Sequence, residues 1–246
     1  MSEHYGAAFF GEREAAVYDD HVAEMFDPAV VTPVVETLSE LAGGGAALEM
    51  GIGTGRIALP LAERGVPVHG IDASAAMVAK LRTKTGNDAI DVTIGDFATA
   101  RVDGRFALVY LIFNTIFNLR TQDEQVACFQ NAADHLDSGG HFVIELGVPD
   151  LQRLPPGQDV FVYAVDARTM SFDVYDVVTQ RLTSNHFVVD DGRVSSYPVE
   201  GRYAWPSELD LMARLAGMCL RERWGGWKRE PFTSLSRSHV SIYEKP

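Results

Sequence analysis

The sequence predicts an α/β protein: a doubly wound, mainly parallel sheet of seven strands, with an antiparallel β insertion that forms a lid. Apolar runs alternate with segments of helical periodicity from residue 47 to residue 146, which is the pattern of parallel strands joined by helices. A glycine-rich turn joins the first strand to the helix that follows it. Residues 159–205 instead alternate apolar and polar side chains, as antiparallel strands do. We expect N-terminal helices and the binding core in 1–150, the insertion in 151–205, and the last helix and strands in 206–246.

Length and composition are those of an ordinary globular protein. The 246 residues can bury a full core, and 46% of them are hydrophobic. The formal net charge of −13 would repel phosphate groups, so we expect no nucleic-acid partner. The start of the chain lacks a signal-peptide pattern and no apolar stretch approaches about 18 residues, so we expect a cytoplasmic protein with no membrane partner. Cys128 and Cys219 are too few and too scattered for a metal site or a disulfide framework, and we expect both in the core.

The first hundred residues predict two helices and then the first three strands. Apolar residues at helical spacing indicate a helix over residues 14–26, and Asp27-Pro28 is typical of an N-cap followed by a proline at the first helical position. Ser74 is expected to cap the helix between the second and third strands. The predicted strands are 47–50, 66–72 and 90–94, with a helix over 57–64 after the first of them.

The remaining elements follow from an apolar run, a capping box and the alternation in the insertion. Residues 106–113 are almost continuously apolar, which predicts a central strand covered on both faces. Thr121 and Glu124 form a capping box that begins a helix. Further strands are expected at 141–146, 160–163, 170–174, 186–189, 203–205, 219–224 and 238–243, with a hairpin turn at Asp190-Asp191-Gly192 and a helix over 206–217.

The turn after the first strand reads Glu49-Met50-Gly51-Ile52-Gly53-Thr54-Gly55. Glycines permit a tight turn and close approach of a ligand, while the helix start offers free N–H groups. The spacing is G-x-G-x-G after an acidic residue, whereas the dinucleotide fingerprint is G-x-G-x-x-G. Glu49 would repel a pyrophosphate and attract the ammonium group of a nucleoside that carries an amino acid. The turn therefore predicts a site for such a nucleoside, and a turn without a ligand is the alternative.

Acidic residues also end the next two predicted strands. Asp72 closes the second strand and Asp96 follows the third. A carboxylate at the carboxyl edge of a parallel sheet can accept both ribose hydroxyls, and a second one a strand further along can accept an adenine amino group. Phe97 and Met77 are placed to flank the purine, although each is also typical of a core residue.

These motifs resemble those of class I S-adenosylmethionine-dependent methyltransferases. The resemblance implies a Rossmann-like core and S-adenosylmethionine as the cofactor. The cofactor-binding residues that it implies are Tyr18, Glu49, Gly51, Gly53, Gly55, Asp72, Ala73, Met77, Asp96 and Phe97.

An early helix with Tyr18, the loop of residues 113–118 and the antiparallel insertion look like the small-molecule methyltransferases that include the amino-sugar N,N-dimethyltransferases. In that subgroup the early tyrosine lies over the cofactor and the loop faces the acceptor, which implies Tyr18 and Asn118 as acceptor-binding residues. Some relatives carry a histidine near Asn118, and an amide cannot take a proton as that imidazole can, but Asn118 can orient an amine and is therefore also a candidate catalytic residue. An amine that arrives neutral needs no base, whereas a hydroxyl acceptor usually does, and His186 is then the candidate. Arg202, Trp205 and Arg237 are further candidates for substrate binding, with structural roles as the alternative.

The leading hypothesis is S-adenosylmethionine-dependent methyl transfer, by in-line displacement, to a nitrogen or oxygen of a small-molecule acceptor. A nicotinamide-dependent oxidoreductase is disfavoured by the glycine spacing and by Glu49. A non-catalytic S-adenosylmethionine-binding protein is the third possibility. The acceptor's identity, and the choice between a monomer and a homodimer, are left open.

Overall fold

The computed structural model describes residues 10–190 and 192–246, and it confirms the predicted fold class. The large sheet consists of β1 (Ala47–Met50), β2 (Val68–Asp72), β3 (Ile90–Ile94), β4 (Phe106–Leu111), β5 (Leu136–Gly147), β10 (Cys219–Trp224) and β11 (Ser238–Glu244). Its strand order is β10-β11-β5-β4-β1-β2-β3. Strands β1 to β5 are parallel, and β11 is antiparallel to both of its neighbours.

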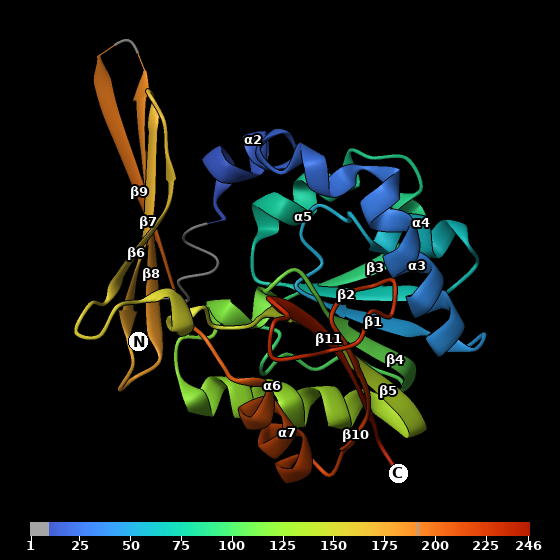
Figure 1. Ribbon diagram of the computed structural model, residues 1–246. Coiled ribbons are helices and arrows are strands. Elements are labelled where there is room, and N and C mark those ends of the chain that lie inside the picture. The colour runs from blue at the N-terminus through green and yellow to red at the C-terminus, as the bar shows by residue number, and fades with distance from the viewer. Residues whose placement is uncertain (1–9, 191) are drawn as a thin grey trace.

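Helices cover both faces of this sheet (Figure 1), with α3, α4 and α5 on one side and α6 and α7 on the other. The described α-helices are α2 (Glu12–His21), α3 (Pro28–Ala42), α4 (Ala58–Glu63), α5 (Ala75–Arg82), α6 (Gln122–His135) and α7 (Pro206–Leu215). Short 3₁₀ turns are η1 (Ala23–Phe26), η2 (Asn87–Ala89), η3 (Thr115–Asn118) and η4 (Leu151–Arg153). This arrangement leaves the carboxyl edge of the parallel strands as the place for a ligand.

The predicted helix starts are confirmed by their capping contacts. Asp27 accepts the N–H of Ala29 at 2.8 Å, with Pro28 at the first helical position of α3. The Ser74 hydroxyl accepts the N–H of Met77 at the start of α5. Thr121 and Glu124 form the complete capping box of α6. Local sequence therefore fixes where these helices begin, and with them where the preceding loops lie.

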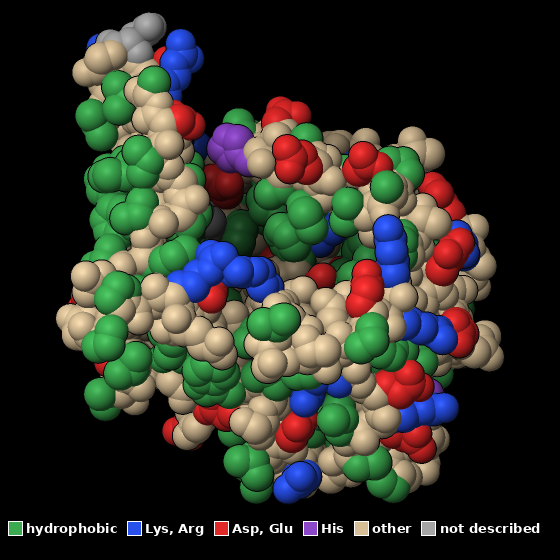
Figure 2. All heavy atoms as spheres, in the orientation of Figure 1, with side chains coloured by type: hydrophobic (Ala, Val, Ile, Leu, Met, Phe, Trp, Pro, Cys, Tyr) green, Lys and Arg blue, Asp and Glu red, His purple; other side chains and the backbone are tan. Residues whose placement is uncertain are grey.

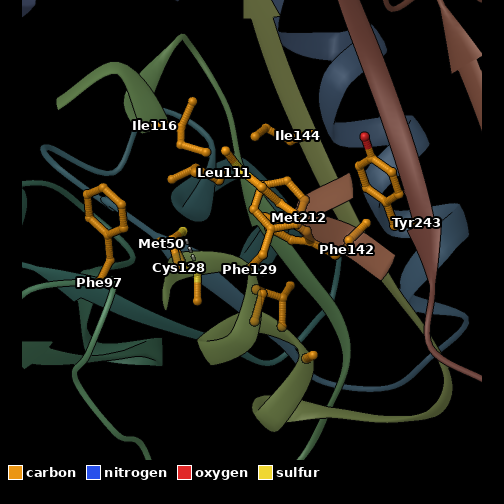
Figure 3. Packing of buried hydrophobic residues seen from close by; sticks show 14 of the residues in the cluster. Met50, Phe97, Leu111, Ile116, Cys128, Phe129, Phe142, Ile144, Met212 and Tyr243 are labelled. Carbon is orange, nitrogen blue, oxygen red and sulfur yellow. Dashed lines mark hydrogen bonds between the residues drawn. The ribbon is translucent and has the colours of Figure 1, made fainter. Parts of the chain in front are cut away.

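Successive residues along the central strands point into two separate cores. In β4, Leu108 and Tyr110 pack with α3 and α4, whereas Val109 and Leu111 pack with α6 and α7. Figure 3 shows the second core, in which Phe129 of α6 lies against Phe142 of β5. Because helices cover both faces of the large sheet, its central strands are continuous apolar runs in the sequence.

The insertion is a separate antiparallel sheet in the order β6-β7-β8-β9. We call it the small sheet; its strands are β6 (Val160–Val165), β7 (Thr169–Asp176), β8 (Arg181–Asp190) and β9 (Arg193–Arg202). The sequence predicted a lid laid over the large sheet; the structure instead places the small sheet beside the large sheet (Figure 1). Gly201 of β9 packs against η3, because a Cβ there would lie 2.2 Å from the carbonyl oxygen of Phe117. The small sheet therefore borders the turn that follows β4.

Several local expectations are wrong. The first helix ends at His21, and η1 replaces its last turn. Strand β5 begins at Leu136, before the predicted start at residue 141, because Leu136 pairs with Phe106 of β4. Cys219 is exposed, since β10 is an edge strand.

In the insertion, residues 203–205 are not a strand; the last strand is β9, which contains Pro198. Proline is tolerated there because β9 is an edge strand. Strands β8 and β9 join where the hairpin turn was predicted, with Asp190 opposite Arg193, although Asp191 lies outside the described residues. Within residues 10–190 and 192–246, no helix combines the length and apolar character needed to cross a membrane.

Candidate cofactor and acceptor site

The glycine turn after β1 closes tightly against β2. The Gly51 N–H donates to the carbonyl of Ile71 at 2.8 Å, and Gly51 and Gly53 have φ angles of 75° and 54°. A Cβ on Gly51 would lie 2.6 Å from Cγ2 of Thr115. Backbone conformation therefore favours glycine at both positions, and the loop after β4 leaves no room for a side chain at the first.

Asp72, the last residue of β2, is oriented by the two turns beside it. Oδ2 accepts the N–H of Gly53 at 2.7 Å, and Oδ1 accepts the N–H of Ser74 at 2.8 Å. Burial raises the pKa of Asp72, and these two N–H bonds partly offset that effect. A carboxylate has about four acceptor sites, so about two remain for ribose hydroxyls.

A cavity of about 90 Å³ brings most of the predicted cofactor residues together. This volume is smaller than the roughly 300–1,000 Å³ of typical ligand pockets, so side chains or α2 must shift to admit a nucleoside. We call it the cofactor cavity; its lining residues are Phe10, Tyr18, Gly51, Gly53, Asp72, Ala73, Met77, Phe97, Thr115 and Asn118. Asp96 directly precedes Phe97, and its Oδ1 accepts the N–H of Ala98 at 2.8 Å.

Glu49 and Gly55 lie outside the lining of this cavity. Glu49 is 5% exposed, and Oε2 accepts a hydrogen bond from the Tyr110 hydroxyl at 3.0 Å. Burial raises the pKa of Glu49 to about 8, against the opposing effects of Tyr110 and the positive charge of Arg56. Gly55 packs against α5, where a Cβ would lie 2.9 Å from Cδ1 of Leu81.

Arg56 follows the glycine turn and was not among the residues singled out from the sequence; it lies outside the lining of the cofactor cavity. Its guanidinium lies 4.6 Å from the centre of the Phe113 ring, and Nη1 donates to the carbonyl of Met25 at 3.2 Å. Its charge also lowers the pKa of Glu49 and of Tyr18, although burial raises both. Arg56 therefore supplies a cation beside Glu49 and Tyr18.

Asp19 connects helix α2 to the glycine turn through a hydrogen bond and an ion pair. Its Oδ1 accepts the Thr54 hydroxyl at 2.6 Å, and Oδ2 lies 2.7 Å from Nζ of Lys84. Lys84 also donates to the carbonyl of Thr54 at 2.8 Å. These contacts hold the adjacent Tyr18 in the wall of the cofactor cavity.

The turn after β4 carries an unusual backbone. Phe113 and Asn114 both have φ of 58°, a left-handed conformation that costs non-glycine residues on the order of 1–3 kcal/mol. Glu145 of β5 holds this turn: Oε2 accepts the Phe113 N–H at 2.9 Å, and Oε1 accepts the Trp227 indole N–H at 2.9 Å. Asn114 accepts the N–H of Gly147 at 2.6 Å. These contacts position η3, whose Asn118 lines the cofactor cavity.

The predicted base His186 does not line the cofactor cavity. It lies on β8 of the small sheet, stacked on Tyr197 with 5.1 Å between ring centres, and 3.3 Å separates Nδ1 from the Ser171 hydroxyl oxygen. Burial lowers its pKa, against the opposing effect of Asp173. Its neighbours are therefore residues of the small sheet.

The three other substrate candidates also lie away from the cofactor cavity. Arg202 is 4% exposed and pairs with Glu208 at 2.6 Å, while it donates to Gln125 Oε1 at 2.6 Å. It ties β9 to α6 and α7, so the structure gives it a structural role. Trp205 precedes α7, and Arg237 is exposed and pairs with Asp150 at 2.7 Å.

A hollow of about 740 Å³ separates α2 from the small sheet and is visible in Figure 2. Glu12, Glu14 and His21 of α2 form one wall, and Tyr197 of β9 belongs to the other. Tyr18 of the same helix lines the cofactor cavity instead, and the two cavities have no described lining residue in common. The hollow provides room for a molecule other than the cofactor.

Comparison with known proteins identifies this architecture. A family profile described as a methyltransferase domain matches residues 47–140. The structure of the CcbJ methyltransferase from Streptomyces caelestis is similar with a TM-score of 0.85 and 35% sequence identity, covering 96% of this chain and 98% of that one. The chain belongs to the class I S-adenosylmethionine-dependent methyltransferases. It is therefore an enzyme with S-adenosylmethionine as its cofactor, and the nicotinamide alternative is set aside.

Two further methyltransferases are similar to this chain over most of its length. The cypemycin N-terminal methyltransferase from Streptomyces sp is 26% identical over 242 residues, which are 94% of this chain and 99% of that protein. The structure of CalS10, an amino pentose methyltransferase from Micromonospora echinaspora, has a TM-score of 0.64 and 21% identity, covering 88% of this chain and 90% of that one. The latter likeness extends to the fold alone.

The residues around the site fit the methyltransferase cofactor. The turn has no side chain at Gly51 and Gly53, which leaves its backbone open to a ligand, and Asp72 presents a carboxylate at the end of β2. Sequence reasoning missed Arg56, Thr115 and Glu145. Arg56 stands directly after the glycine motif, and Glu145 is a carboxylate within an apolar strand, so both carried a signal.

Proposed function

We propose that this methyltransferase transfers the methyl group of S-adenosylmethionine to the nitrogen of a small-molecule amine that arrives uncharged. The observation that carries the proposal is the chemistry of the cofactor cavity. Its polar side chains other than Asp72 are Tyr18, Thr115 and Asn118. Burial raises the pKa of Tyr18, and neither a hydroxyl nor an amide takes a proton at neutral pH. These groups can orient an amine lone pair but cannot deprotonate an alcohol.

The cofactor supplies an electrophilic methyl group when bound. Asp72 is proposed to accept the ribose hydroxyls, Asp96 the adenine amino group, and Met77 and Phe97 to flank the purine. Glu49 is proposed to stabilise the ammonium of the methionine portion, and Arg56 its carboxylate. Tyr18, held in place by its neighbour Asp19, covers the cavity and helps to exclude water from the acceptor nitrogen.

Two further observations support an amine acceptor. The net charge of −13 attracts cations, which amines are before they lose a proton. The cypemycin enzyme is named for methylation at an N-terminus, which is an amine. A hydroxyl acceptor is the second candidate, and it would require His186 to reach the acceptor from the small sheet.

The test uses pairs of amines and alcohols with the same carbon skeleton. Each is incubated with the enzyme and S-adenosylmethionine, and methylated product is measured by mass spectrometry. We expect methylation of amines only, with a rate that rises with pH up to the pKa of each amine and therefore differs between amines. Methylation of the alcohol members, or a pH profile that stays the same for amines of different pKa, would contradict the proposal.

A further inference from the structure

A second cavity, of about 360 Å³, lies on the other side of η3 from the cofactor cavity. Asn114 and Phe117 line this second cavity, whereas Thr115 and Asn118 line the cofactor cavity. Its remaining walls are the segment after β5 and the inner face of the small sheet. Because a single turn separates the two cavities, one small molecule that reaches around this turn contacts both.

The pairing of β7 with β8 gives this second cavity its polar groups. Asp173 is opposite Ser184, and Tyr175 is opposite Leu182, so all four side chains share the inner face of the small sheet. Tyr163 of β6 joins them, with its hydroxyl 2.9 Å from the Ser184 hydroxyl oxygen. The cavity therefore combines a carboxylate, several hydroxyl groups and apolar walls, which is the usual composition of a small-molecule site.

Asp173 is the unsatisfied group of this cavity. Its Oδ1 is shielded from solvent and has no hydrogen-bond partner among the described residues. By contrast, Asp150 lines the same cavity but is paired with Arg237 at 2.7 Å and Arg153 at 3.1 Å. Burial raises the pKa of Asp173, and the Ser184 hydroxyl, the His186 ring and the Tyr175 hydroxyl oppose that effect only in part. Shielding one oxygen of a half-buried carboxylate without a cationic partner has a cost in free energy, and a cationic ligand would reduce that cost.

We propose that this second cavity binds the non-reacting part of the acceptor through a positively charged group, with the Asp173 carboxylate as its counter-ion. The proposal rests on the proposed function for one point only, namely that the molecule in the cavity is the methyl acceptor. The rings of Phe117 and Tyr203 line the cavity as well, and aromatic faces also attract cations. The carboxylate torsion of an aspartate is broad, so either oxygen can turn toward the ligand.

The experiment uses benzylammonium and its neutral counterpart benzyl alcohol as probes of the full chain saturated with S-adenosylhomocysteine. Dissociation constants are measured by calorimetry and chemical-shift perturbation for the wild type, Asp173→Asn and Asp176→Asn. The last variant removes the same charge from β7, but from an exposed side chain bonded to Thr179. We expect the wild type and Asp176→Asn to prefer benzylammonium by about ten- to hundredfold, and Asp173→Asn to lose that preference.

Two results would overturn the inference: equal binding of both probes by the wild type, or an undiminished preference in Asp173→Asn. The wild-type comparison decides the matter alone if the Asp173 variant does not fold. Failure of the proposed function would give different results: S-adenosylhomocysteine would not bind, or alcohols would be methylated. In both cases the preference for benzylammonium over benzyl alcohol can still be measured. A crystal structure with benzylammonium is expected to place its nitrogen beside Asp173, and a nitrogen elsewhere would refute the assignment.

Discussion

The large and small sheets each carry a carboxylate toward the site, but they hold it differently. Both oxygens of Asp72 accept backbone N–H groups from turns that directly adjoin β2. Asp173 has an oxygen without a partner among the residues described, and its neighbours are side chains of the small sheet: Tyr175 on its own strand and Ser184 on β8. The carboxylate of the cofactor half, the large sheet, is thus preorganised by backbone N–H groups, whereas that of the small sheet, the proposed acceptor half, has bonding capacity left for a ligand. This difference suits a half that always binds the same cofactor and a half that selects one acceptor.

The two halves are joined by the ion pair between Arg202, which is buried, and Glu208, which is partly exposed. Arg202→Met is expected to lower the free energy of unfolding by about 3–5 kcal/mol, because it leaves Glu208 without its cation. Chemical denaturation measures this loss. The exposed pair between Arg64 and Glu36 is the matched control, and Arg64→Met should cost less than about 1 kcal/mol. If Arg202→Met left stability unchanged and only weakened acceptor binding, the substrate role predicted from sequence would be restored.

Asp72→Ala tests the role of the preorganised carboxylate in the cofactor half. We expect S-adenosylmethionine to bind more weakly by about 1–3 kcal/mol, because ribose hydroxyls lose their acceptor and the Gly53 and Ser74 N–H groups lose theirs. Calorimetry with S-adenosylhomocysteine gives the affinity. Asp91→Ala, an exposed aspartate on β3, serves as the control. An unchanged affinity in Asp72→Ala would mean that the ribose lies elsewhere.

The same difference between the halves explains which features could be predicted from the sequence. The caps at Asp27, Ser74 and Thr121, the glycine turn after β1 and the aspartate at the end of β2 each depend on residues that are close together in the chain. They could therefore be predicted from local patterns. The large sheet's carboxyl edge then brings separate turns together without further information.

The acceptor half could not be predicted in the same way. Which face of the small sheet Asp173 occupies depends on strand register, and the sequence did not reveal β9 as a strand. Arg202 was assigned to the substrate because its partners Gln125 and Glu208 are distant in the sequence. The support of η3 by Glu145 likewise depends on a contact between β5 and the turn after β4. Such contacts follow from tertiary packing and leave no short-range signal.

Glu145 lies between the two halves, because η3 borders both cavities. Glu145→Gln replaces one acceptor oxygen with an NH₂ group, so either the Phe113 N–H or the Trp227 indole N–H loses its partner. We expect kcat to fall about tenfold through misplacement of η3, with little change in cofactor affinity. Trp227→Phe removes only the indole donor and should have a smaller effect. A parallel loss of cofactor affinity would place Glu145 in the cofactor half alone.

Glu49 provides the most specific test, because its ionisation links cofactor binding to pH. Its pKa in the folded protein is about 8, raised by burial, whereas an unfolded glutamate has a pKa of about 4.3. The folded state therefore holds this proton more tightly, and the ligand-free protein should lose stability as pH rises from about 4.3 to about 8. Glu49→Gln should flatten that part of the stability profile, as thermal unfolding at several pH values would show.

Cofactor affinity should follow the opposite trend. If the ionised Glu49 carboxylate stabilises the cofactor's ammonium, binding must release the proton, and the association constant should rise about tenfold per pH unit below pH 8 and then level off. Calorimetry at pH 7 in buffers of different ionisation enthalpy would detect release of nearly one proton. Glu49→Gln should bind more weakly without releasing it. Proton release that persists in Glu49→Gln would assign the linkage to another group and leave Glu49 a structural residue hydrogen-bonded to Tyr110.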